Sequence, residues 1–302
     1  MKSALRYFVL ATLGVLLLLF AAWVYVHHNA INKPVKPPLA HPFLERLRSG
    51  QPLVIAYQGS SLEAPPNTMI AFEKAAALGP DIALWVDVRP TFDGTLVVFE
   101  PKDLSGETDG QGWVQLAKKA DLDKLDAGYR FTNDDGTSFP FRGQGLKIPT
   151  LSEVLTRFPD RFLVLNFQDY RAGVDTLVVN AIENAKASER VLISSPEDGI
   201  LKDLRKLRPK WAFGTSQAQA TVLLMLSELR LEAAASINGD VFVGPTAHGA
   251  SLFRLSDPIA KELHRRKMKI VLGPAVDDDQ ALKWKAEGIE GIVTRDPSSL
   301  LR

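Results

Sequence analysis

From Gln51 onward, short β-branched and aliphatic runs alternate with longer segments whose apolar residues follow helical spacing. This alternation is typical of a parallel sheet. We predict strands over residues 53–56, 82–88, 96–99, 162–167, 191–194, 211–214, 241–243, 269–272 and 291–293. About eight strand–helix units in about 250 residues favour a closed (β/α)8 TIM barrel over an open sheet. Nine candidates are one too many, so one strand should lie outside the barrel.

Residues 101–147 break the alternation with a segment rich in Gly and Asp. Loops of this length inside a compact domain usually have a function, and we expect the insert to cover the carboxyl ends of the strands. Chemistry in a TIM barrel lies at those ends. The candidate site residues are therefore those that end or follow strands: Tyr57, Gln58, Trp85, Asp87, Glu100, Asn166, Gln168, Ser194, Ser195, Thr215 and His248.

The twenty residues from Tyr7 to Val26 contain no charge. A run of about twenty apolar residues is long enough to span a bilayer as a helix. Lys2 and Arg6 precede the run, and Trp23 near its far end suits a membrane interface. The run is longer than the apolar core of a cleaved signal peptide. We predict an uncleaved signal anchor of a single-pass membrane protein, with the barrel on the extracytoplasmic (periplasmic or extracellular) side.

The predicted organisation has four parts. Residues 1–6 form a short basic terminus and residues 7–26 the transmembrane anchor. Residues 27–50 form a proline-rich stalk, since several closely spaced prolines favour extended, semi-rigid chain, with a short helix over residues 44–49. Residues 51–302 form the barrel, including the insert.

Composition excludes some classes of function. The formal net charge of +1 gives no electrostatic reason to expect a nucleic-acid partner. The absence of cysteine excludes disulfides, a thiol nucleophile and thiolate metal sites.

The ordered motifs of residues 52–302 resemble the glycerophosphodiester phosphodiesterase family. Ala56-Tyr57-Gln58-Gly59 stands where that family has A-H-R-G, and Ala64-Pro65-Pro66-Asn67-Thr68 where it has A-P-E-N-T. Trp85-Val86-Asp87-Val88 corresponds to E-x-D-V, and residues 93–101 to D-G-x-x-V-V-x-H-D. The segments 148–155, 191–195 and 291–297 match later family motifs in the same order.

The resemblance implies a TIM barrel that hydrolyses deacylated phospholipids with two acid–base histidines and a divalent cation. In this chain Tyr57 and Glu100 occupy the two histidine positions. Pro66 and Trp85 occupy two metal-ligand positions, and Gln168 a third.

The phosphate-binding arginine of the family is replaced as well, by Gln58, which leaves Asp87 as the one unchanged functional position. A tyrosine ordinarily titrates near 10, and Ca²⁺ needs about six oxygen ligands. The primary interpretation is therefore a degenerate member, a binding or scaffold pseudoenzyme without a cofactor. Tyr57, Gln58, Asn67 and Trp85 would line its cleft.

Two alternatives stay open. In the first, an active phosphodiester hydrolase uses relocated groups: Glu63, Asp87 and Glu100 would form an acidic cluster, with His248 as a base. Asp87 and Glu63 would then be the residual ligands of Ca²⁺ or Mg²⁺. In the second, Trp85, Tyr57 and Trp113 would bind a sugar, and Asp87 with Glu100 would provide the carboxylate pair of a glycan-cleaving enzyme. The ligand is accordingly a phosphodiester, a lipid-derived molecule or a sugar.

Overall fold

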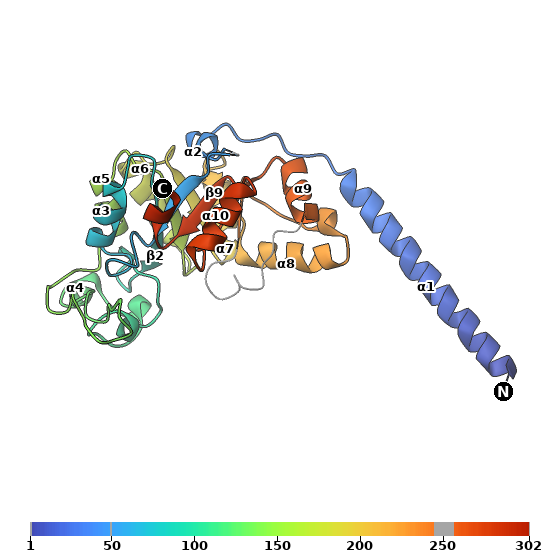
Figure 1. The fold of residues 1–302 in the computed structure, drawn as a ribbon, viewed down its shortest axis with the longest axis horizontal. Coiled ribbons are helices and arrows are strands. Elements are labelled where there is room, and N and C mark those ends of the chain that lie inside the picture. Colours follow the sequence, from blue (N-terminus) through green and yellow to red (C-terminus); the bar gives the residue numbers. More distant parts are fainter. Residues whose placement is uncertain (1, 49, 245–256, 302) are drawn as a thin grey trace.

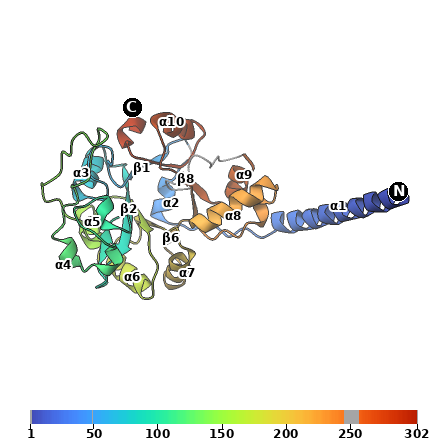
Figure 2. The ribbon, with the colours of Figure 1, turned by 90° about the horizontal axis from the view of Figure 1, so that it is seen from below.

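The structure is a computed structural model that describes residues 2–48, 50–244 and 257–301 (Figure 1). A long helix, α1 (Lys2–Ile31), projects from a rounded body in which the strands lie at the centre and the helices around them. The view in Figure 2, turned by 90°, shows the same projection of α1 away from the body.

Eight parallel strands form the body in the order β6-β5-β4-β2-β1-β9-β8-β7. Their bounds are β1 Leu53–Tyr57, β2 Ala83–Pro90, β4 Leu163–Phe167, β5 Val191–Ser194, β6 Ala212–Phe213, β7 Val241–Val243, β8 Lys269–Leu272 and β9 Gly291–Thr294. A parallel bridge between Gly214 and Val241 joins β6 to β7 and nearly closes the ring. The predicted TIM barrel is confirmed.

The ninth predicted strand, β3 (Leu96–Val98), lies outside the barrel. It pairs antiparallel with the end of β2, in the register Val88 to Val98. A parallel crossover requires a dozen or more residues. The short turn after Pro90 can therefore only return the chain as a hairpin.

Several helices begin where the sequence supplies capping side chains. Thr68 accepts from the backbone of Ala71 before α3, and Thr150 forms a capping box with Glu153 before α5. The bounds of the outer helices are α3 Met69–Ala77, α5 Leu151–Arg157, α6 Val174–Asn184, α7 Asp198–Leu207, α8 Gln217–Glu228, α9 Asp257–Arg265 and α10 Asp278–Ala286. Short turns η3 (Glu232–Ala234) and η4 (Pro297–Leu301) follow α8 and β9.

The strands are buried on both faces, as expected for a barrel. One apolar layer lies between strands and helices, and a second fills the barrel interior. Helix α2 (Pro42–Arg46) closes the amino-terminal end of the barrel, because fully buried Phe43 and Leu47 belong to the interior layer.

The segment predicted as a stalk lies along the barrel. Lys36 Nζ is 3.8 Å from Asp240 Oδ1, and the ring Nε2 of buried His41 is 2.9 Å from Ser188 O. This segment therefore contributes to the barrel's closed end, which a free spacer would not do.

The insert has a small core of its own and contains η1 (Leu104–Gly106), η2 (Val114–Leu116) and α4 (Lys119–Leu122). Phe99 and Val97 at the end of β3 pack into this core and join it to the barrel. Figure 1 shows the insert on the side of the body opposite to α2.

Candidate functional site

Asp87 on β2 is the centre of the predicted site, and its side chain is fully buried. Five side-chain N–H groups donate hydrogen bonds to its carboxylate: Trp85 Nε1 (3.0 Å), Asn166 Nδ2 (2.8 Å) and Gln168 Nε2 (2.9 Å) to Oδ1, and Gln58 Nε2 (2.7 Å) and Asn67 Nδ2 (3.3 Å) to Oδ2. A carboxylate offers about four lone-pair positions. This one is therefore saturated by neutral donors.

Strand register explains why these groups meet. β2 lies between β1 and β4, and Asp87 is directly opposite Asn166 while Trp85 is opposite Tyr57. Gln58 follows β1 at once, so its side chain enters the same end of the barrel as the side chains at the end of β4. The common direction of parallel strands therefore brings all the donors to one edge of the sheet.

The loop after β1 holds its donors in an uncommon backbone conformation. Gln58 and Asn67 have φ values of 58° and 56°, in the left-handed region that few non-glycine residues adopt. The Asn67 N–H donates to Gln58 O (3.0 Å), and Asn67 Oδ1 accepts from the backbone N–H of Asp87 (3.2 Å). Gly59, with φ 85°, fits closely, since an added Cβ would lie 2.5 Å from the backbone of Ala71.

Tyr57 and Trp85 are buried beside each other, with ring centroids 5.9 Å apart. Both belong to the apolar interior of the barrel, and Trp85 has no exposed surface. Burial raises the pKa of Tyr57 well above its ordinary value, and the charges of Asp87 and Glu100 raise it further. Tyr57 is therefore a neutral phenol at physiological pH and cannot act as a base.

Glu100 lies beyond β3 at the edge of the same region, and a buried arginine fixes its backbone. Arg89 Nε donates to Glu100 O at 2.7 Å, and the guanidinium also pairs with Asp169. The backbone at the position predicted to replace a catalytic histidine is thus held by a buried arginine.

Glu107, in the insert after η1, was missed by the sequence analysis. Burial raises its pKa to about 8, with smaller contributions from the charges of Glu100 and Asp87. A carboxyl group with this pKa is mostly protonated at neutral pH. The sequence carried no signal for it, because the proximity of Glu107 to Glu100 depends on how the insert folds over β3.

The remaining predicted site residues are not gathered here. Glu63 is exposed and pairs with Lys74 (3.3 Å), so the predicted acidic cluster with Asp87 and Glu100 is not formed. His248 lies outside the described residues. Trp113 is 52% exposed on the insert, while the faces of Tyr57 and Trp85 are covered, so these three aromatics do not form the predicted sugar platform.

A cavity of only about 20 Å³ lies at the barrel end beside this centre. Its lining includes Asn166, Ser194, Ser195 and Thr215, which were predicted from the strand ends. This space is about that of one water molecule.

The sequence of residues 58–299 matches the model of the glycerophosphoryl diester phosphodiesterase family. The chain belongs to this family. It is 30% identical over 260 residues to a glycerophosphodiester phosphodiesterase of Caldanaerobacter subterraneus, covering 82% of this chain and 96% of that protein. It is also 37% identical over 171 residues to the Bacillus subtilis glycerophosphodiester phosphodiesterase, covering 52% and 56% of the two chains.

Solved structures of the family share the fold. The glycerophosphoryl diester phosphodiesterase domain of a Mycobacterium tuberculosis protein superposes with a TM-score of 0.69 at 20% identity, covering 83% of this chain and 99% of that one. A phosphodiesterase of Oleispira antarctica, solved with its product sn-glycerol-3-phosphate, superposes with a TM-score of 0.62 at 24% identity, covering 83% and 97%. The barrel of this glycerophosphodiester phosphodiesterase-like chain is therefore the family fold.

The residues at the centre do not fit the divalent cation that is typical of the family. The N–H groups around Asp87 direct their positive ends to the position that a cation would need, and the Trp85 N–H cannot be exchanged for an oxygen. Rotating the amide of Asn67 would break its bond from the Asp87 N–H. Within residues 2–48, 50–244 and 257–301, no group of three or more His, Cys, Asp or Glu side chains is placed to hold a metal ion.

Proposed function

We propose that this chain is a membrane-anchored, non-hydrolytic member of the glycerophosphodiester phosphodiesterase family, with a binding or scaffold role. The observation that carries the proposal is the saturation of Asp87 by five neutral N–H donors. Hydrogen bonds from neighbouring side chains compensate this buried charge. Without them, a bound cation would have to compensate it.

The acid–base chemistry supports the same conclusion. General catalysis of phosphodiester cleavage needs groups that titrate near the working pH. Burial holds the pKa of Tyr57 far above that range, and Gln58 supplies no charge for the phosphate. Around the centre, Asp87 and Glu100 are acidic, the charge of Arg89 is paired with Asp169, and Arg295 lies 5.9 Å from the Tyr57 ring. This balance disfavours an anionic ligand.

Membrane anchoring is supported by α1. Val9–Ile31 is long and apolar enough to cross a membrane, and its most apolar stretch is not buried within the protein. An apolar surface of this kind requires lipid or another cover. We place the span at residues 7–26 and the barrel on the extracytoplasmic side.

A second candidate function rests on Glu107. A carboxylic acid with a pKa of about 8 could donate a proton to a leaving group at neutral pH, and Glu100 lies close enough to influence it. This would be a phosphodiester hydrolase with a relocated acid.

The test pairs calorimetric titration of Ca²⁺ and Mg²⁺ with turnover of glycerophosphodiesters, using the full-length chain in detergent. The Bacillus subtilis relative, assayed in the same buffer, controls for substrate and metal quality. We expect no metal binding that depends on Asp87 and no turnover. Metal-dependent turnover lost in Asp87→Asn would refute the proposal. Metal-independent turnover lost in Glu107→Gln would establish the second candidate instead.

A further inference from the structure

The carboxyl-terminal third of α1 is packed on the barrel. Trp23 Nε1 donates to Leu229 O at 2.9 Å, and His27 Nδ1 is 3.1 Å from Arg230 O. Eight residues after Trp23, the carbonyl oxygen of Ile31 accepts from Arg265 at 3.3 Å. Figures 1 and 2 both show this end of α1 beside α8 and α9, and it also contacts the turn η3.

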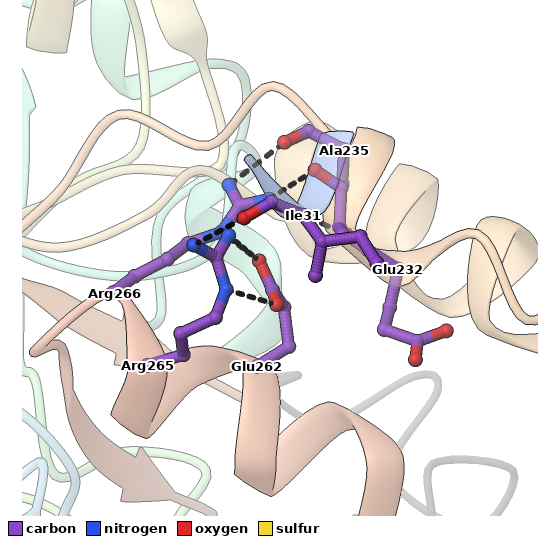
Figure 3. Close-up of polar contacts among 7 residues, drawn as sticks. Ile31, Glu232, Ala235, Glu262, Arg265 and Arg266 are labelled. Atoms are coloured by element: carbon purple, nitrogen blue, oxygen red, sulfur yellow. Dashed lines mark hydrogen bonds and ion pairs between the residues drawn. The ribbon is translucent and has the colours of Figure 1, made fainter. Parts of the chain in front are cut away.

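A buried ion-pair cluster fixes this junction (Figure 3). Glu262 accepts from both Arg265 (2.7 Å) and Arg266 (2.6 Å), and Arg266 also donates to the carbonyls of Ala233 and Ala235, both at 2.8 Å. Burial acts to raise the pKa of Glu262, but the two arginines outweigh it and leave the pKa below its ordinary value. α1, η3 and α9 are therefore joined through charged groups that remain paired at neutral pH.

Helix α8 carries an apolar stripe on the face turned away from the barrel. Ala218, Val222, Met225 and Leu229 recur at intervals of four, three and four residues, and all four are exposed. The exposed fractions are 46% for Val222, 65% for Met225 and 61% for Leu229. Ala220 and Leu223 are buried on the opposite face. A helix that is apolar on both faces is usually covered on both faces.

The contacts of Trp23 and Ile31 place the Leu229 end of this stripe relative to a bilayer. The apolar run ends at Val26, where His27 and His28 follow, three residues after Trp23 and five before Ile31. At 1.5 Å per residue, Trp23 is about 4–5 Å inside the end of the run and Ile31 about 7 Å beyond it. The headgroup layer is several ångströms thick on each side of the hydrocarbon core. If the hydrocarbon core ends with this run, Leu229 would lie at its edge and Arg265 among the headgroups.

Cationic side chains occur at the headgroup level. A cavity of about 270 Å³ is lined by Lys33, Lys36, Arg205, Arg265 and Arg266. Glu262 and Asp240 neutralise part of this charge through the bonds already described and the pairing with Lys36. Exposed Lys33 has no ion-pair partner among the described residues. Basic groups beside a span attract anionic lipids.

We propose that the α8 stripe (Ala218, Val222, Met225 and Leu229) docks into the interface of an anionic bilayer beside α1, with the basic cavity against lipid headgroup phosphates. The barrel would then have a fixed orientation on the membrane. Figure 1 shows α2 at the top and α1 running downward from that level, so docking turns the closed end of the barrel away from the lipid. This inference rests on the membrane anchor of the proposed function.

The absence of cysteine allows a direct test, because one introduced cysteine gives one labelled position. Met225→Cys reports on the stripe. Thr156→Cys, an exposed position on α5 far from α1, is the matched control, and Leu16→Cys is the reference inside the span. Each full-length variant is labelled with an environment-sensitive fluorophore in vesicles of phosphatidylcholine with phosphatidylglycerol. Quenching by a lipid-bound quencher is compared with quenching by a water-soluble one.

We expect the ratio of lipid-phase to aqueous quenching at Met225→Cys to exceed that at Thr156→Cys severalfold and to approach that at Leu16→Cys. In phosphatidylcholine alone, the ratio at Met225→Cys should fall while that at Leu16→Cys stays unchanged. Equal ratios in the two lipids would overturn the role of the basic cavity.

Three results separate the remaining explanations. An aqueous label at Met225→Cys with a lipid-immersed label at Leu16→Cys would overturn the docking and leave the anchor intact. An aqueous label at Leu16→Cys would overturn the anchor itself. A label at Met225→Cys shielded from both quenchers, together with a doubled particle mass, would show that a second copy of the chain covers the stripe.

Discussion

The substitution Asp87→Asn tests whether hydrogen bonds have replaced the cation at the centre of the barrel. Asparagine keeps one acceptor oxygen and replaces the other by an NH₂ donor. The less crowded side is that of Oδ2, which accepts from Gln58 and Asn67. Gln58 can rotate its amide to present an oxygen. Asn67 cannot do so without losing its bond from the backbone of residue 87.

The magnitude follows from these contacts. A hydrogen bond to a charged group contributes about 1.5–3 kcal/mol, and a stranded buried donor costs about 1–3 kcal/mol. With one donor stranded and the other bonds weakened, we expect the free energy of unfolding to fall by about 3 kcal/mol. In a domain of this size that corresponds to a decrease in Tm of roughly 6–12 °C.

The assay is thermal unfolding of the full-length chain in detergent, with and without Ca²⁺. Asp81→Asn, at an exposed carboxylate paired with Arg46, is the matched control and should shift stability by less than about 0.5 kcal/mol. An unchanged or raised Tm for Asp87→Asn would refute the reasoning. That result is expected if Asp87 belongs to an empty cation site, because removing its charge would then relieve repulsion. A Tm that rises with Ca²⁺ in the wild-type chain but not in Asp87→Asn would refute it as well.

Three further predictions concern titration, catalysis and packing. Because burial raises the pKa of Glu107 to about 8 in the folded chain, against about 4.5 when exposed, the folded state holds an extra proton between these values. Tm should therefore fall from pH 5 to pH 8, and Glu107→Gln should flatten this slope; equal slopes in the two proteins would contradict the assignment. No single change among Tyr57→His, Gln58→Arg, Pro66→Glu, Trp85→Glu and Glu100→His should give measurable glycerophosphodiester turnover, because catalytic groups act as a unit; activity in any one of them would show that the machinery is nearly intact. Phe43→Ala should lower the free energy of unfolding by about 3–5 kcal/mol in denaturant titrations, since Phe43 is fully buried in the closed end of the barrel, whereas Glu45→Ala on the same short helix should have little effect.

Much of the barrel could be predicted from local patterns. β5, β7 and β8 have the predicted bounds, and most other elements differ by one or two residues. The exceptions are informative. Apolar residues continue at helical spacing over residues 218–235, but α8 ends at Glu228, and a separate turn, η3, follows it and contacts α1. The helix ends where Arg230 adopts a left-handed backbone conformation (φ 57°), which its residue type does not predict.

The sequence predicted where the candidate site lies, but only part of which side chains meet there and how they interact. Motif spacing placed Tyr57, Gln58, Trp85 and Asp87 at one end of the barrel, because parallel strands end at one edge. It could not show that the replacements direct N–H groups to Asp87, since that depends on side-chain orientation across three strands. Glu63, near in sequence to Gln58, was expected in the site and instead faces Lys74 at the surface.

The sequence by itself determined the alternation of strands and helices, the family of the barrel, the residue types at the positions of the family's motifs and the apolar run at the amino terminus. These are properties of residue identity and spacing along the chain. The tertiary structure alone decided that β3 lies outside the barrel, that Glu107 approaches Glu100, that the proline-rich segment packs on the barrel and that the α8 stripe lies beside α1. The last two depend on groups far apart in sequence, which only the closed packing of the chain brings into contact. The first two depend on the path of the chain through the turn after Pro90 and through the insert.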